Sequence, residues 1–558
     1  MQSDGYQGTI PRLLAAAADR DAAGTWLRSD SGELTFGGAA AAAALTADAL
    51  RDAGVRRGDL VMVTARNTPP YLIGWLALAV LGAVTVAVNP RGSAAELAGL
   101  LSQTRPRALI TDSGLARLAA EAGGAAEAGG AAEVGGAAEA GAPVLDIAAL
   151  VPSGWADREQ LAAAARGARL EAGAVAPGDP AVLIPTSGTT GRSKLVIQTH
   201  RAYAMAGEGF PFWMELTAAD RMMTSLPLFH INAPAYSVMG SLACGAGLVL
   251  LERFAASDFL DAARRHGATE FNAIGAMLEI LMRQPERPDD ASTPLRLCYT
   301  GPAPEQERQL EMERRFGLRI VVGYAMSESP YGLIWARGTR PYGTLGSARQ
   351  HPVLGNVNEA RAVAPDGSGA PGASLPPGAS GELLLRNPVT TPGYWGMPAE
   401  TAALFAADGW LHTGDLVTVG ADNTYTFVSR IKEVIRRRGE NLSPLEVEEV
   451  LEGHPAVLEA AVTGVPSDLT EEEVKAFIVA APGQSPDFAE LRAFAAARLA
   501  AFKVPRYWQQ VDELPRTPTA RIAKHRLPGN HPPGEYDAAA PAAPQAPATG
   551  SPATGETQ

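Results

Sequence analysis

Hydrophobic and polar positions alternate with two different spacings in the first part of the chain. Between residues 34 and 115, Ala- and Leu-rich stretches with helical spacing are interrupted by β-branched runs at Leu60–Val63 and Val84–Val88. A second run of this kind spans residues 180–330, with strands expected at Ala181–Ile184, Gly247–Leu251 and Ile320–Val322. Helical segments that alternate with short apolar strands are typical of parallel sheets covered by helices. The pattern therefore predicts an α/β fold for this part of the chain.

The pattern changes after about residue 340, where Gly/Pro turns separate short alternating strands at Gly381–Leu385 and Tyr425–Val428. Such a pattern is typical of an antiparallel sheet, and a compact α+β portion is expected after it. Residues 119–142 repeat a unit of the form AAEAGG, which has nothing to bury and predicts a flexible surface insertion. The Pro/Ala/Gly/Thr-rich tail is expected to be disordered. We divide the chain into a large domain of residues 1–429, a small domain of residues 430–527, and a tail of residues 528–558.

The best candidate for a membrane span is the uncharged stretch from Leu72 to Val88. It is shorter than the ~20 residues that a spanning helix needs, and Asn-Pro closes it. A buried helix that turns through Gly82 into a strand is therefore favoured. The start of the chain lacks a basic leader followed by an apolar segment, so no signal peptide is expected. These features predict a soluble protein without a membrane span.

The composition narrows the class of protein further. A chain of 558 residues is too long for one compact core, and its 46% apolar and 19% charged residues are typical of globular domains. A net charge of −13 argues against a nucleic-acid partner, since binding to a phosphate backbone needs a basic face. Cys244 and Cys298 have no paired spacing, so neither a disulfide framework nor a thiolate metal site is expected, and a reducing cytoplasm fits. The sequence leaves the oligomeric state open.

A Gly- and hydroxyl-rich segment, TSGTTGRSK, directly follows the strand expected at Ala181–Ile184 and its proline. Glycines let the backbone turn tightly, so that successive N–H groups point inward and hold an anion. The hydroxyls and the lysine ammonium add donors and positive charge for phosphate oxygens. The glycine spacing is not that of the Walker A loop. A plain polar turn would not explain the hydroxyls of Thr186, Ser187, Thr189 and Thr190 together with a lysine. We predict a phosphate site formed by Thr186, Ser187, Gly188, Thr189, Thr190, Gly191 and Lys194.

The same segment resembles the sequence T-S-G-T-T-G-x-P-K of the superfamily that includes acyl-CoA synthetases, luciferases and peptide-synthetase adenylation domains. Further motifs follow in the expected order, so the resemblance covers about residues 30–527. The segments RRRGENLSPLEVEEVL and AAFKVPRYWQQVDELPRTPT are similar to carnitine/crotonobetaine-type and medium-chain acyl-CoA ligases. The resemblance implies a large N-terminal domain with two doubly wound αβα subdomains and a β-barrel region. It also implies a small, mobile α+β C-terminal domain.

Two further motifs gain roles from this resemblance. The segment YAMSE at Tyr324 resembles the family's Y-G-M-T-E, with Ala and Ser in place of Gly and Thr. By resemblance, Tyr324 stacks on adenine, Ser327 contacts a phosphate, and Glu328 holds Mg²⁺, and the side-chain types suit these tasks. The segment WLHTGDL matches the family's W-x-x-T-G-D. It implies that Asp415 accepts hydrogen bonds from the ribose hydroxyls, to which Arg430 adds a donor.

Other positions are assigned more by their place in the family pattern than by their own chemistry. Lys432 stands at the family's hinge, around which the small domain turns between two half-reactions, although a solvated charge run is the alternative. His230 resembles the gate beside the acyl pocket, and Gly301 begins the segment that passes adenine and the acyl group. Aromatic clusters at Phe210–Trp213 and Tyr331–Trp335 belong either to the substrate pocket or to the core, and core packing is favoured.

One position departs from the family. The family ends in a loop of the form P-R-T-x-x-G-K, whose lysine bridges the substrate carboxylate and the α-phosphate. Here Arg521 takes the place of that lysine. Arginine keeps the positive charge, but its planar fork is bulkier and favours bidentate oxyanion contacts. Lys524 lies close in sequence, yet an offset of three residues would place it on the opposite face of a strand, so Arg521 is favoured as the catalytic cation.

These motifs together predict that ATP and a small organic acid give acyl-AMP and pyrophosphate, and that the acyl group then passes to CoA. The expected catalytic residues are Arg521, Lys194, Glu328 and His230, with Mg²⁺ on Glu328. One alternative is an ATP-dependent diazotase of secondary metabolism, which activates nitrite for coupling to an aromatic amine. Another is an adenylation protein that loads a carrier protein. A third, a non-catalytic nucleotide-binding protein, is disfavoured because Glu328, Asp415 and Lys194 are intact.

Overall fold

The fold is that of a computed structural model, in which the chain divides into two compact units, Met1–Phe427 and Val428–Gln558. The sequence-based division at residues 429 and 430 falls close to this point. The structure describes residues 5–92, 94–112, 115, 142–164, 170, 173, 175–186, 193–301, 303–364, 374–437, 440–466, 472–499, 501–516, 522–529, 531–532 and 535–538. The predicted insertion therefore lies outside the described residues, apart from residue 142.

The first unit contains a six-stranded sheet of the order β6-β5-β3-β4-β7-β8. Its strands are β3 (Leu60–Thr64), β4 (Val84–Ala87), β5 (Ala108–Thr111), β6 (Val144–Asp146), β7 (Pro180–Thr186) and β8 (Lys194–Thr199). All neighbouring pairs are parallel except β7 and β8, which are antiparallel. The predicted strands and the parallel sheet are confirmed in this region.

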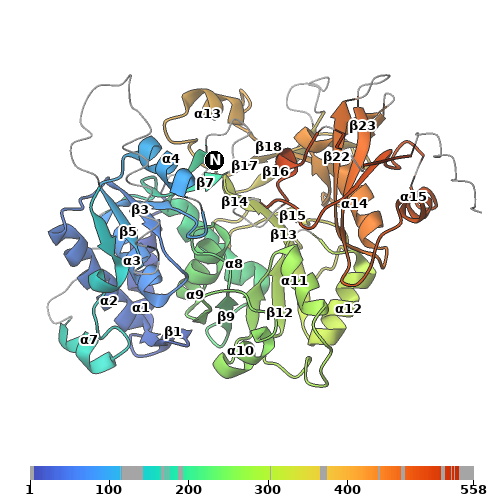
Figure 1. The fold of residues 1–558 in the computed structure, drawn as a ribbon. Helices are drawn as coiled ribbons and strands as arrows, with labels where there is room; N and C mark the ends of the chain where they lie inside the picture. Colours follow the sequence, from blue (N-terminus) through green and yellow to red (C-terminus); the bar gives the residue numbers. More distant parts are fainter. Residues whose placement is uncertain are drawn as a thin grey trace, which may run out of the picture. The chain divides into compact units, whose positions relative to one another are not determined.

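Helices connect and cover these strands (Figure 1). They are α1 (Ile10–Arg20), α2 (Phe36–Asp52), α3 (Pro69–Leu81), α4 (Ala94–Thr104), α6 (Ile147–Leu150) and α7 (Arg158–Ala164). Helix α3 is buried over nearly its whole length and ends at Gly82, which has a φ of 76° that favours glycine. This is the predicted buried helix that turns into strand β4. In the described part of the chain, no helix is long and apolar enough to cross a membrane.

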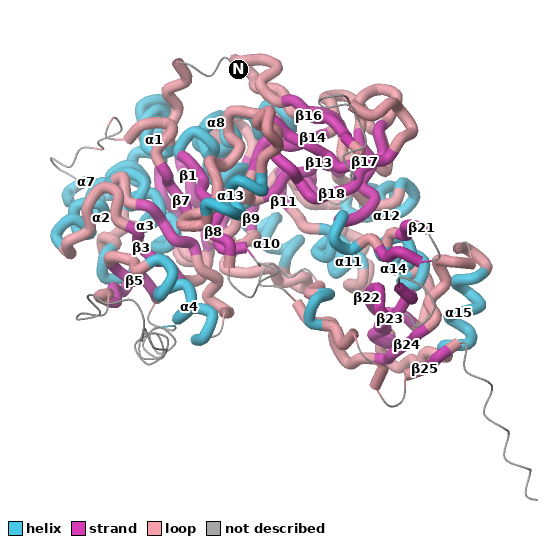
Figure 2. The backbone as a smooth tube through the Cα atoms, turned by 90° about the horizontal axis from the view of Figure 1, so that it is seen from above, coloured by secondary structure: helices cyan, strands magenta, loops and turns pink. Residues whose placement is uncertain are grey.

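The first unit also contains a nine-stranded sheet of the order β15-β14-β13-β12-β11-β9-β10-β1-β2. Its strands are β1 (Thr25–Ser29), β2 (Gly32–Thr35), β9 (Arg221–Thr224), β10 (Gly247–Leu250), β11 (Glu270–Asn272), β12 (Leu297–Thr300), β13 (Arg319–Met326), β14 (Ser329–Ile334) and β15 (Ser347–Ala348). The strands from β10 through β9, β11 and β12 to β13 run parallel, so their carboxyl ends lie at one edge. Figure 2 shows β9 and β11 beside each other within this sheet.

Helices lie on both faces of this sheet. They are α8 (His200–Met214), the π-helix η2 (Ala233–Val238), α9 (Met239–Cys244), α10 (Phe259–His266), α11 (Gly275–Met282) and α12 (Gln306–Phe316). Helices α8 and η2 cover one face, where Phe210 stacks on Tyr236 with ring centroids 5.1 Å apart. Helix α10 covers the other face, where Phe259 packs against Phe271 of β11 at 5.0 Å. The doubly wound arrangement expected for this region is therefore present.

The chain then forms a four-stranded antiparallel sheet, where the family resemblance implied a β-barrel region. Its strands are β16 (Glu359–Val363), β17 (Ser380–Arg386), β18 (Leu411–Val419) and β19 (Tyr425–Arg430), and helix α13 (Pro398–Leu404) lies between β17 and β18 in sequence. Alternate residues of β18 are buried along its whole length, which is why its sequence shows the period-two pattern. The antiparallel sheet predicted after residue 340 is confirmed.

The second unit is the predicted α+β portion. It contains the hairpin of β20 (Ile435–Arg437) and β21 (Glu440–Leu442), the sheet of β22 (Val457–Pro466), β23 (Glu472–Ala480), β24 (Tyr507–Gln510) and β25 (Tyr536–Asp537), and helices α14 (Pro444–Glu452) and α15 (Phe488–Ala496). Its core gathers apolar side chains of these elements, among them Leu451, Ile478, Leu491 and Trp508.

One expectation about the tail is wrong. Disorder was predicted from residue 528, but Tyr536–Asp537 forms strand β25 and pairs with β24. The fully buried ammonium of Lys475 lies 2.5 Å from the Glu535 carboxylate, and Asp537 pairs with Arg506 at 3.0 Å. A buried charge needs a counterion, so this short stretch is held although its composition resembles that of a disordered segment. Residues 539–558 lie outside the described residues.

Candidate active site

Strands β7 and β8 form an antiparallel hairpin whose tip is the predicted phosphate loop. Thr186 and Lys194 face each other across the hairpin, and the Thr186 hydroxyl donates to the Lys194 carbonyl at 3.4 Å. The predicted residues between them, Ser187, Gly188, Thr189, Thr190 and Gly191, lie outside the described residues. The structure thus places the two ends of the loop next to each other, at the edge of the six-stranded sheet.

A segment that sequence reasoning missed pairs with the other edge of β8. Tyr394 forms a β-bridge with Val196, and the Trp395 N–H donates to the Leu195 carbonyl at 2.9 Å. This pairing holds the Tyr394 ring against the start of β8, where the Lys194 ammonium lies 4.7 Å from the ring centroid. An ammonium over an aromatic face is attracted by the ring quadrupole. The sequence signal was weak, because an aromatic residue after Pro-Gly is as typical of core packing as of a site.

Tyr394 also contacts the predicted metal-binding carboxylate. Its hydroxyl donates to Glu328 Oε1 at 2.9 Å, and the Glu328 carbonyl accepts from the Thr391 N–H at 2.7 Å. Burial, and then the neighbouring carboxylate, raise the pKa of Tyr394, so the hydroxyl keeps its proton and acts as a donor. The phosphate-loop lysine and Glu328 are therefore joined through one tyrosine.

The turn that carries Glu328 is tied to β8 as well. The Gln198 side-chain amide donates to the Ser327 carbonyl, and Gln198 is fully buried. Within the described part of the chain, no group of three or more His, Cys, Asp or Glu could hold a metal by itself. A single carboxylate nevertheless fits Mg²⁺, which is usually bound by one or two carboxylates together with nucleotide phosphates. Glu328 is thus suited to share a metal ion with the phosphates of ATP.

Tyr324 and Asp415, predicted to hold adenine and ribose, meet in the structure. The Tyr324 hydroxyl, at the end of β13, donates to Asp415 Oδ2 of β18 at 2.5 Å. Asp415 is 1% exposed, and its N–H donates to the Thr413 hydroxyl at 3.1 Å, which fixes the turn of the strand. His412, to which no role was assigned, contacts Glu382 at 2.9 Å. Two residues far apart in sequence therefore present an aromatic face and a carboxylate side by side.

Two further predicted residues lie at carboxyl ends of the nine-stranded sheet. His230 follows β9 and packs against Phe229 with ring centroids 4.4 Å apart. Gly301 follows β12, and a Cβ at this position would lie 2.5 Å from the Gly323 carbonyl oxygen. Only glycine allows this close approach of two backbone segments. Both positions fit the edge at which parallel α/β sheets bind their ligands.

The aromatic side chains of the clusters at Phe210–Trp213 and Tyr331–Trp335 are buried, apart from the partly buried Phe212, and pack in the core, as favoured. Trp213 of the first cluster packs against a residue that sequence reasoning missed, the 1% exposed Arg349. Its guanidinium lies 4.6 Å from the Trp213 ring centroid and donates to the Tyr236 hydroxyl at 2.7 Å and the Tyr299 hydroxyl at 2.5 Å. Its only sequence signal was a single charge in a loop, which is normally exposed.

The remaining predicted residues belong to the second unit. Arg430 ends β19, and Lys432 lies in the short 3₁₀-helix η3 (Ile431–Glu433) that follows; the side chain of Lys432 lies outside the described residues. Arg521 also lies outside them. Lys524 is among the described residues. The expectation that it lies on a strand is wrong, because it begins the 3₁₀-helix η4 (Lys524–Arg526).

Lys524 has a structural partner of its own. Its ammonium lies 2.8 Å from the carboxylate of Glu448 and 3.4 Å from that of Glu433. Glu448 is 7% exposed and also accepts from the Val462 N–H at 2.6 Å. Burial raises the pKa of Glu448, and the lysine charge opposes this shift. Lys524 is therefore the counterion of a buried carboxylate, which favours Arg521 over Lys524 as the catalytic cation.

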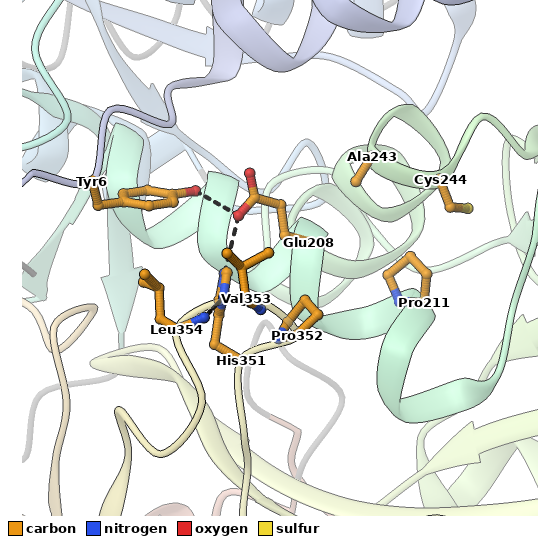
Figure 3. A pocket seen from close by; sticks show the side chains of 9 residues that line it. All are labelled: Tyr6, Glu208, Pro211, Ala243, Cys244, His351, Pro352, Val353 and Leu354. Atoms are coloured by element: carbon orange, nitrogen blue, oxygen red, sulfur yellow. Dashed lines mark hydrogen bonds and ion pairs between the residues drawn. The ribbon is translucent and has the colours of Figure 1, made fainter.

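A pocket of about 440 Å³ lies elsewhere in the first unit (Figure 3). Tyr6 and His351 each contact the same oxygen of Glu208, both at 3.0 Å. The His351 Nδ1 atom accepts from the Val353 and Leu354 N–H groups, so its Nε2 carries the proton that is donated to Glu208. These polar groups satisfy one another, and the rest of the lining is mainly apolar. The pocket shares no residue with the site described above.

Comparisons with known proteins identify the family of the chain. Residues 14–395 match the AMP-binding enzyme family, and residues 446–521 match the AMP-binding enzyme C-terminal domain. The crotonobetaine/carnitine–CoA ligase of Salmonella enteritidis PT4 (strain P125109) is 31% identical over 490 residues, which cover 86% of this chain and 90% of that protein.

Solved structures show the same fold. ATP-bound MatB from Rhodopseudomonas palustris superimposes with a TM-score of 0.77 at 25% identity, covering 92% of this chain and 97% of that one. The anthranilate CoA ligase AuaEII in complex with anthranoyl-AMP gives a TM-score of 0.79 at 24% identity, covering 94% and 98%. The predicted superfamily and its two-domain α/β fold are confirmed. The chain thus belongs to the AMP-binding enzyme family and is an ATP-dependent, AMP-forming ligase of the acyl-CoA ligase type.

Proposed function

We propose that the protein activates a small organic acid with ATP and transfers the acyl group to CoA. The observation that carries this proposal is a set of contacts within the first unit that brings together four of the residues expected to bind ATP. Tyr324 and Asp415 form one contact pair, and Tyr394 joins Lys194 to Glu328. Tyr324 lies on β13, and Glu328 lies in the turn directly after it. The Tyr324 pair therefore suits the nucleoside, and the Glu328 contacts suit the phosphates, of one nucleotide.

In the proposed first step, a carboxylate oxygen of the acid attacks the α-phosphorus of ATP, and pyrophosphate leaves. The protein contributes mainly by positioning and by charge. The loop from Thr186 to Lys194 would donate hydrogen bonds to phosphate oxygens, and Arg521 would bridge the acid and the α-phosphate. Mg²⁺, held by Glu328, would act as a Lewis acid on the phosphates. Asp415 and Arg430 would fix the ribose, and His230 would stand beside the acid.

In the proposed second step, the CoA thiol attacks the acyl carbon, and AMP leaves. The names of the relatives support CoA as the acceptor, since they pair CoA with small acids such as crotonobetaine, carnitine and anthranilate. We further propose that rotation at Lys432 separates the two steps. Lys432→Pro would restrict φ there, so adenylate formation should continue while thioester formation stops. Equal loss of both steps would contradict a hinge at this position.

Pyrophosphate–ATP exchange tests the first step. The assay uses a panel of small acids and, separately, nitrite together with an aromatic amine. At least one acid should support exchange when nitrite is absent. Adding CoA, or a carrier protein, to the active acid identifies the acceptor. Lys194→Ala should reduce exchange sharply because the loop loses its cation, and Lys503→Ala, which removes a lysine paired with Glu446 in the second unit, should not. Exchange that depends on nitrite, or that survives Lys194→Ala unchanged, would contradict the proposal.

A further inference from the structure

Asn272 places a buried amide at the carboxyl edge of the nine-stranded sheet. It is the last residue of β11 and is 1% exposed. Its Nδ2 donates to Asn232 Oδ1 at 2.7 Å, in the loop that follows β9 and also carries His230. Within the described part of the chain, its Oδ1 atom has no hydrogen-bond donor. A buried acceptor without a donor costs free energy, so this oxygen is suited to bind a ligand.

The surroundings of Asn272 define which ligand groups fit. Asn272 pairs in register with Tyr299 of β12, and residues paired in this way project from the same face of the sheet. The Tyr299 hydroxyl accepts from the Arg349 guanidinium. Among the residues that the structure describes, Arg349 has hydroxyl and carbonyl partners but no carboxylate. The positive charge of Arg349 is therefore held at the hydroxyl of Tyr299, the residue that pairs with Asn272.

We propose that Asn272 determines specificity and selects acids that carry an uncharged hydrogen-bond donor, a hydroxyl or a neutral amino group, in the acyl part. This inference rests on the proposed function. The Oδ1 acceptor would receive the donor of the substrate, while the Asn232 contact fixes the orientation of the amide. The same site disfavours acids with an ammonium group, because the Arg349 charge would repel it.

Matched acids test this assignment in the full-length protein. AMP formation is measured with butyrate against hydroxybutyrates, and with benzoate against hydroxybenzoates and aminobenzoates, together with an acid that carries a quaternary ammonium. We expect kcat/KM to be about 10- to 100-fold higher for at least one donor-bearing acid than for its parent, because a site built around a substrate donor rejects the analogue that lacks it. The quaternary ammonium acid should be the poorest substrate of its size.

Two variants separate recognition from folding. Asn272→Leu and Asn272→Ala remove the acceptor, and each should bring the ratio between donor-bearing and parent acid to within about threefold of one. The KM for ATP should stay as in the wild type. Thr300→Val is the matched control, since Thr300 is buried at the end of β12 but alternation places it on the opposite face from Tyr299.

The outcomes distinguish this inference from the proposed function. A preference ratio that persists in a folded Asn272 variant, or AMP formation without any preference in the wild type, would overturn the role of Asn272 and leave the proposed function standing. AMP formation with none of the acids would overturn both. A ratio that collapses in Thr300→Val as well would show that the effect is not specific to Asn272.

Discussion

Tyr394→Phe removes a single oxygen that joins the ring over Lys194 to the carboxylate of Glu328. The lost hydrogen bond, 2.9 Å long in the native protein, orients the Glu328 carboxylate from a tyrosine that is largely buried. Loss of such a bond to a charged group costs ~1–3 kcal/mol. If Glu328 holds Mg²⁺, this energy corresponds to a rise of about 5- to 150-fold in the Mg²⁺ concentration needed for half-maximal exchange. The phenylalanine ring still faces Lys194, so the KM for ATP at saturating Mg²⁺ should change little.

Tyr394→Leu separates the two contacts of the residue. It removes the hydroxyl and also the aromatic face that lies 4.7 Å from the Lys194 ammonium. The lost cation–π contact is worth ~0.5–2 kcal/mol, which predicts a rise of about 2- to 30-fold in the KM for ATP in addition to the Mg²⁺ effect. Tyr342→Phe, which removes a tyrosine hydroxyl elsewhere in the first unit, serves as the control.

The assay is pyrophosphate–ATP exchange, titrated with Mg²⁺ at saturating ATP and with ATP at saturating Mg²⁺. Because burial and the nearby carboxylate raise the pKa of Tyr394, its hydroxyl stays protonated, and the effect of Tyr394→Phe should be the same from about pH 6 to 9. A Mg²⁺ requirement equal to that of the wild type would refute the role of Tyr394 in positioning Glu328. A change in the KM for ATP alone would also refute it.

Asp415→Ala should raise the KM for ATP by about 30- to 700-fold, since charge-assisted hydrogen bonds to ribose are worth ~2–4 kcal/mol. The exposed Asp422→Ala is the control and should leave this KM unchanged. An unchanged KM in Asp415→Ala would show that the motif forms only a turn. Lys524→Ala should lower the free energy of unfolding of the second unit by ~3–5 kcal/mol, because a buried carboxylate loses its counterion. Arg521→Ala should leave stability unchanged and reduce adenylate formation. The reverse pattern in denaturation and exchange assays would contradict both assignments. Burial lowers the pKa of His200 from 6.5 to about 4, so between these pH values the unfolded chain binds a proton that the folded chain does not. The free energy of unfolding should therefore fall by ~3 kcal/mol as the pH drops from 6.5 to about 4. Urea denaturation of wild type and His200→Gln measures this loss, and the same pH dependence in both proteins would exclude His200 as its source.

The sequence was informative wherever local chemistry alone fixes the structure. Helix α3 ends at Gly82 because a glycine can adopt the left-handed conformation there, and the apolar run before it could only be buried. Strand β18 shows its alternation directly, because one face of the antiparallel sheet is covered. The pairing of Tyr324 with Asp415 could be expected from the family motifs, although the distance between them required the structure.

The contacts that sequence reasoning missed depend on pairing between distant segments. Tyr394 reaches Lys194 and Glu328 only because its segment adds to the edge of β8. Arg349 is a charged loop residue that becomes buried, since aromatic rings and hydroxyls from several elements surround it. The order of Tyr536 likewise depends on a long-range strand partner, which no local composition can reveal.

The position of bond cleavage in ATP tests the central claim most directly. The acid is supplied with oxygen-18 in its carboxylate, and the products of a reaction with ATP, Mg²⁺ and CoA are analysed by mass spectrometry. If a carboxylate oxygen attacks the α-phosphorus, the account predicts AMP and pyrophosphate in equal amounts, with the label in the phosphate of AMP. ADP and orthophosphate as products, or AMP without the label, would contradict it.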